Sequence, residues 1–129
     1  MNKFFEKNSD AFYFAFRVIV GLLFLLHGIQ KLPGIMSGET AFFSLFGFAG
    51  VIELIAGLFF ILGLFVKTTA LVAGIEMLVA FFYIHVRSKG TLNPLQNGGE
   101  ASLLFLAAFL VLMAFGARKW SIDRARRKK

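Results

Sequence analysis

Four long apolar runs constrain this chain more than any other feature of its sequence. They cover about 12–30, 44–66, 68–86 and 101–117. A helix needs about 20 predominantly apolar residues to span a bilayer, within a range of about 17–25. The runs do not alternate between apolar and polar residues, so they predict helices rather than strands. We therefore predict an all-α polytopic membrane protein, a bundle of four transmembrane helices.

The composition supports lipid as the surroundings of these helices. Charged residues make up 16% of the 129 residues, whereas an ordinary soluble domain has about 25%. The 18 Phe exceed what so small a core could enclose, so much apolar surface must face the bilayer. The chain has no Cys, which excludes disulfides, thiolate nucleophiles and cysteine-bound zinc or iron–sulfur clusters. No metal site is predicted.

The distribution of basic residues predicts the orientation of a single membrane domain, 1–129. Seven of the 14 Lys and Arg lie in a basic tail, 118–129, and the net charge is +7. A basic tail directly after an apolar helix indicates an anchor facing anionic lipid rather than a nucleic-acid surface. With both termini cytoplasmic, ten basic residues face the cytoplasm and three face outward, which obeys the positive-inside rule. The turn-rich connections 31–43 and 87–100 then face outward.

Ionisable residues inside the predicted spans are costly, so they indicate a site or a necessary ion pair. Helical rise places Arg17 and Glu76 at similar depth near the cytoplasmic side, where we expect a structural ion pair. A second layer lies toward the outer surface. It gathers His27, Lys31, Glu53, His85 and Glu100, which we expect to converge on one cavity.

Ordinary roles stay open for part of this second layer. His85 and Lys31 are also compatible with the headgroup region, where polar tips are comfortable. Glu100 is compatible with a first-turn acid that the helix dipole favours. Glu53 is different, because it lies in the middle of an apolar helix and must face the bundle interior.

The order of these residues resembles the DoxX family of small bacterial membrane proteins. The resemblance covers nearly the whole chain. It is carried by Arg17, by Gly21 to Lys31 with His27-Gly28, by Glu53-Leu-Ile-Ala-Gly57 with Leu62-Gly63-Leu64, by Met77, Ala80 and His85, by Asn97-Gly98-Gly99-Glu100, and by Gly116 before Trp120-Ser121-Ile122-Asp123. It implies a four-helix protein of the bacterial cytoplasmic membrane, similar to the membrane subunit of thiosulfate:quinone oxidoreductases and associated with quinone-linked redox and oxidative-stress functions.

Three functions fit these observations. The first is a quinone- or quinol-interacting subunit, with Glu53, His27 and His85 as catalytic groups and Lys31, Glu100 and Asn97 as ligand-binding groups. Its electrons would come from a soluble or membrane redox partner, and whether the chain is an enzyme by itself stays open. The second is a non-enzymatic small transporter, which with four helices would need a homo-oligomer, or an assembly partner of a membrane complex. The third is a haem protein with His27 and His85 as ligands.

The charge distribution generates a first testable prediction. A reporter that is active only in the periplasm should stay inactive when it is fused after Lys129. The same reporter inserted in 31–43 or 87–100 should be active, because these connections face outward in the predicted orientation. Activity at the C-terminal fusion would overturn the topology.

Overall fold

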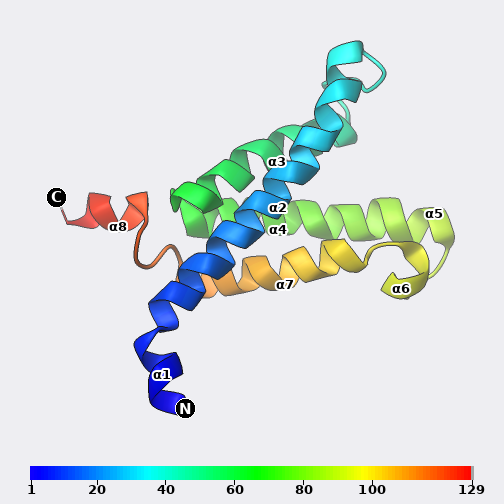
Figure 1. The fold of residues 1–129 in the computed structure, drawn as a ribbon. Coiled ribbons are helices and arrows are strands. Elements are labelled where there is room, and N and C mark those ends of the chain that lie inside the picture. Colours follow the sequence, from blue (N-terminus) through cyan, green and yellow to red (C-terminus); the bar gives the residue numbers. More distant parts are fainter. Residues whose placement is uncertain (129) are drawn as a thin grey trace.

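The computed structural model describes residues 1–128, so Lys129 of the predicted basic tail lies outside the described residues. Within that range the chain is helical and contains no strand, which confirms the all-α prediction (Figure 1). The elements are α1 (Asn2–Lys7), α2 (Ser9–Ser37), α3 (Leu45–Leu62), α4 (Val66–Val79), η1 (Ala80–Val86), α5 (Arg87–Lys89), α6 (Pro94–Asn97), α7 (Glu100–Phe115) and α8 (Ile122–Arg127).

The long helices form two packed pairs, α2 with α3 and α4 with α7 (Figure 1). Small residues let the first pair approach closely, as is usual for helices in lipid. A Cβ added to Gly57 of α3 would lie 2.5 Å from the backbone nitrogen of Leu25 in α2, so only glycine fits there. Phe24, Phe60 and Phe109 come from three different helices and are fully buried against one another, which joins the two pairs in one core.

Three stretches are long and apolar enough to cross a membrane: Ser9–Ser37, Leu45–Leu62 and the continuous helical stretch Val66–Lys89. The fourth predicted span is a shorter apolar helix, Glu100–Phe115. Its 16 residues rise about 24 Å, less than the roughly 30 Å of a hydrocarbon core. The part of the chain that the structure describes therefore has three candidate spans and one shorter apolar helix.

The predicted boundary of the first helix is wrong. We expected a connection from residue 31, but α2 runs through Pro33 to Ser37 and ends at left-handed Gly38 (φ 80°). The extra turns pack against α3, where Lys31 and Ile35 contact Gly50. This packing outweighs the local cost of proline, which falls in the last turns of the helix. The connection between α2 and α3 is correspondingly short.

The predicted ion pair between Arg17 and Glu76 is also wrong. Arg17 is fully buried, and its guanidinium donates to four backbone carbonyl oxygens. One belongs to Phe60, near the end of α3, at 2.9 Å. The others lie between α7 and α8, in Ala117, Lys119 and Trp120, where Arg118 and Trp120 adopt positive φ. A planar guanidinium with five donors can satisfy several carbonyls at once, so no carboxylate is needed.

Asp123 ties the same C-terminal segment to the start of α4. Its carboxylate accepts hydrogen bonds from the backbone nitrogens of Phe65 and Val66, at 2.7 and 3.0 Å. These nitrogens would otherwise be unpaired, because the first amides of a helix have no partner within it. The Asp123 amide donates to the carbonyl of Gly63 at 3.0 Å. Arg17 and Asp123 thus fix both helix pairs to each other at the end that carries the termini.

The contacts of Arg17 and Asp123, together called the clamp below, generate the second prediction. Arg17→Ala should lower the free energy of unfolding by roughly 3–5 kcal/mol, because several buried carbonyl groups lose their donor at about 1–3 kcal/mol each. Thermal unfolding in mild detergent measures the loss. Arg124→Ala on exposed α8 is the matched control and should unfold like the wild type. Equal effects of the two substitutions would contradict the clamp.

Candidate functional site

A cavity of about 570 Å³ lies between the two helix pairs, at the end away from the termini. The pairs diverge toward that end (Figure 1). Most lining side chains are apolar, and several of them on α3 and α4 are also half exposed at the surface of the bundle, among them Phe46, Phe48 and Ile75. The cavity therefore reaches the apolar surface between α3 and α4. Its volume is in the range of small-molecule sites.

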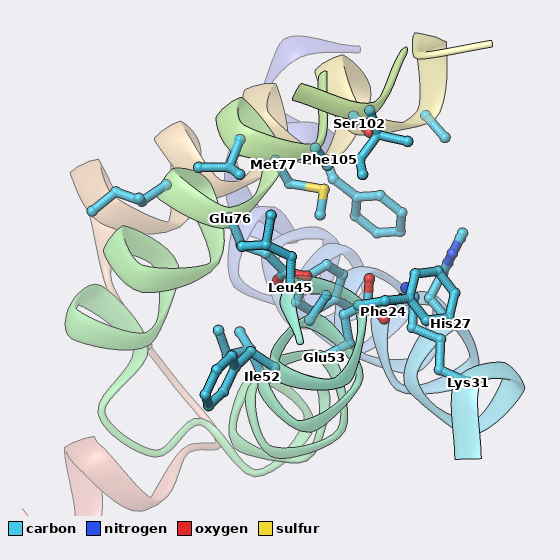
Figure 2. Close-up of a pocket in the computed structure, with 18 of the residues that line it drawn as sticks. Phe24, His27, Lys31, Leu45, Ile52, Glu53, Glu76, Met77, Ser102 and Phe105 are labelled. Atoms are coloured by element: carbon cyan, nitrogen blue, oxygen red, sulfur yellow. Dashed lines mark hydrogen bonds and ion pairs between the residues drawn. The ribbon is translucent and has the colours of Figure 1, made fainter. Parts of the chain in front are cut away.

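An ion pair lies within the cavity. The ammonium group of Lys31 in α2 and the Glu53 carboxylate in α3 are 2.5 Å apart (Figure 2). The Glu53 side chain is 4% exposed and that of Lys31 is 16% exposed, so both charges are largely removed from solvent. The ammonium also lies over the Phe46 ring, 5.2 Å from its centre. Glu53 faces inward, as expected for a carboxylate that would be costly in lipid.

Glu76 lines this cavity as well, although the sequence predicted it beside Arg17 near the cytoplasmic side. It extends from α4 toward the same space as Glu53, and the two carboxyl groups are neighbours (Figure 2). Its Oε2 atom is buried and has no hydrogen-bond partner among residues 1–128. Counting helical rise from each helix end placed Glu76 below this layer, because that arithmetic treats all helices as upright and parallel.

The two histidines line the same cavity. His27 comes from α2, and its ring meets Phe105 edge to face at 5.4 Å between ring centres. His85 comes from η1, where the helix changes from α to π winding over seven residues. A π-helical segment is rare and is often found at functional sites. Sequence reasoning brought His27, Lys31, Glu53 and His85 to one place, and the structure does the same.

Two predicted ligand-binding residues lie outside the lining. Glu100 is exposed at the first turn of α7, the ordinary position for an acid near a helix N-terminus. Asn97 is buried, but its side chain donates to the carbonyl of Thr91 at 3.0 Å and accepts from the amide of Gly99 at 2.7 Å. These bonds shape the connection before α7. Ser102, in the first turn of α7, lines the cavity instead.

Among the residues that the structure describes, no group of three or more His, Asp or Glu side chains is arranged to hold a metal ion. The polar groups that line the cavity are one ammonium group, two carboxyl groups, two imidazoles and one hydroxyl group. Such a set can donate and accept hydrogen bonds and can exchange protons with a bound molecule. The apolar walls accommodate the rest of an amphipathic ligand.

The fold and this cavity define a small helical membrane protein with an amphipathic site between its helices. The sequence profile of the DoxX family matches residues 12–86, more than half of the chain, so the chain belongs to the DoxX family. This confirms the family resemblance seen in the sequence. The match includes Arg17 and every cavity residue of α2, α3, α4 and η1.

Two relatives cover almost the whole chain. A Haemophilus influenzae protein, named only "Uncharacterized protein", is 36% identical over 96% of this chain and 97% of its own length. The Bacillus subtilis protein "Putative oxidoreductase CatD" is 27% identical over 95% of this chain and 90% of its own length. No solved structure matches the chain.

The ion pair in the cavity generates the third prediction. Lys31→Met should lower the free energy of unfolding by about 3–5 kcal/mol, because it leaves the buried Glu53 carboxylate without a counter-charge. Glu53→Gln should cost less, because the Lys31 ammonium that it leaves without a counter-charge is more exposed than the Glu53 carboxylate, and the amide oxygen still accepts its hydrogen bond. Chemical or thermal unfolding in detergent compares the two variants.

The exposed ion pair between Lys119 and Asp10 is the matched control. Lys119→Met should change the unfolding transition little, because solvent screens exposed pairs. If Lys31→Met behaves like Lys119→Met, the cavity pair is not the buried interaction described above.

Proposed function

We propose that this DoxX protein binds a lipid-soluble quinone or quinol in the cavity between its helix pairs and takes part in membrane redox chemistry. The observation that carries the proposal is the division of the cavity into an apolar wall open between α3 and α4 and a polar set of ionisable side chains. A quinone has the same division, with an apolar tail and a ring bearing two oxygen atoms. A ligand dissolved in the bilayer could enter sideways without crossing water.

The side chains suit the chemistry of the ring. Reduction of a quinone takes up two electrons and two protons, so the site needs donors to the ring oxygens and groups that exchange protons. His27 and His85 can hydrogen-bond a carbonyl oxygen, and Glu53 can take up or release a proton. Lys31 holds the Glu53 side chain in place and balances its charge.

The electrons would come from a soluble or membrane redox partner, because the chain has no Cys to bind an iron–sulfur cluster. In this proposal the protein is the membrane subunit of a quinone-linked oxidoreductase, with a role in defence against oxidative stress. The printed name of the Bacillus subtilis relative, an oxidoreductase, is consistent with this class. The proposed role does not require the chain to catalyse the reaction alone.

The proposed location is the bacterial cytoplasmic membrane, with four passes and both termini in the cytoplasm. The relatives come from bacteria, and the basic residues are concentrated beside the termini. In this arrangement α7 crosses as a short fourth helix, which a locally thinned bilayer or polar flanks at its ends can accommodate. The cavity then lies in the outer half of the membrane.

The fourth prediction tests the ligand. Protein purified in mild detergent should retain lipid quinone, detected by extraction and chromatography, and should bind an added short-chain benzoquinone. Glu53→Gln should remain folded, with a smaller loss of stability than Lys31→Met, yet lose most of the bound quinone, because it removes the proton-exchanging group at the ring.

Glu100→Gln is the matched control, because this acid lies outside the cavity lining and should leave quinone binding unchanged. A Soret band in the purified protein would favour the haem alternative. Uptake of a weak acid into liposomes that Glu53→Gln abolishes would favour transport. Full quinone binding by Glu53→Gln would contradict the proposed site.

A further inference from the structure

Glu76 is a partly buried acid that the proposed chemistry has not used. It lines the cavity from α4, and within residues 1–128 its Oε2 atom has no hydrogen-bond partner although solvent does not reach it. Buried polar atoms in proteins nearly always have a hydrogen-bond partner, so a buried oxygen without one indicates a partner outside the described residues. Its position on the wall of a cavity suggests that the missing partner is a bound molecule.

The charges around Glu76 restrict its form. Lys31 is the ammonium group in the lining, and Glu53 already binds it at 2.5 Å. Glu76 is the neighbour of Glu53, so a second carboxylate would be repelled by the first and would lose its hydration among apolar side chains. His27 and His85, the other titratable groups of the lining, belong to α2 and η1, and the His27 ring packs against Phe105.

A protonated Glu76 removes both costs. A neutral carboxyl group is not repelled by Glu53, and its O–H can donate a hydrogen bond to the Glu53 carboxylate beside it before a ligand binds and to a ligand oxygen afterwards. Lys31, Glu53 and Glu76 then form a unit with no net charge. Such a unit suits a neutral ligand oxygen better than an anionic head group, which would meet the Glu53 charge while Lys31 is already paired.

We infer that Glu76 carries a proton and donates a hydrogen bond from its carboxyl group to a carbonyl oxygen of a neutral ligand in the cavity. The ligand's identity as a quinone rests on the proposed function. The inference adds that Glu76 is the group that recognises the ligand. It also adds that the cavity rejects amphiphiles with a carboxylate head. Glu76 is thereby a ligand-binding and selectivity-determining residue, not half of a structural ion pair.

Infrared spectroscopy tests the protonated acid without any ligand. The wild-type protein should show the C=O band of a carboxylic acid that shifts in deuterium oxide. The band should disappear in Glu76→Gln and persist in Glu100→Gln, the exposed acid outside the cavity. A spectrum in which Glu76→Gln removes no such band overturns the inference.

Binding tests the hydrogen bond and the selectivity. The probes are a short-chain benzoquinone and a fatty acid with a tail of the same length. Glu76→Gln keeps a donor and should bind the quinone nearly as well as the wild type does. Glu76→Leu has none and should bind it about tenfold more weakly, the effect of one lost hydrogen bond in a buried site. The wild type should prefer the quinone over the fatty acid.

The outcomes separate this inference from the proposed function. If the wild type binds no quinone, the proposed function fails, while the infrared band still decides whether Glu76 is protonated. If quinone binds and Glu76→Leu binds it as tightly as the wild type, the proposed function stands and the donor role of Glu76 falls. If the fatty acid binds as tightly as the quinone, the inferred preference for a neutral ligand over a carboxylate head group is wrong.

Discussion

The buried guanidinium of Arg17 is the interaction on which the architecture depends. It joins the end of α3 to the segment after α7, and Asp123 in that segment joins it in turn to the start of α4. Both helix pairs are therefore fixed together at the end that carries the termini. Because they are held at one end, they can diverge at the other without separating, and the cavity occupies the resulting fork.

This arrangement reconciles two opposing demands of a bilayer. Ionisable side chains are costly there, yet this chain places several of them on apolar helices. At the clamp, backbone carbonyls surround Arg17 and offset the cost. In the cavity, Lys31 and Glu53 neutralise each other. The apolar side chains that remain exposed, including many Phe and Leu, need no partner in the protein because lipid solvates them.

The sequence sufficed for those features that depend on one helix at a time. Run length and composition predicted the helices, and a constant rise brought His27, Lys31, Glu53 and His85 to one level. Features that depend on the angle between helices were missed: α3 and α4 are inclined to each other, so counting residues along each helix did not reveal that Glu76 lies beside Glu53. Glu100 had the right level but the wrong face. The partners of Arg17 could not be foreseen, since they are carbonyls presented by a turn through left-handed Arg118 and Trp120.

The π-helical segment shows how a local departure from ideal geometry serves the cavity. In an α-helix each residue advances about 100° around the axis, so one extra residue of winding turns every later side chain by about that amount. The departure begins at Ala80, on the cavity wall, and His85 and Ile84 of the same segment line the cavity. The tightly packed half of the same helix, around Ala70 and Ala73, keeps regular α geometry. Irregular winding thus begins within the stretch of the helix that lines the cavity, and it sets the direction of His85 and Ile84, which a ligand would meet.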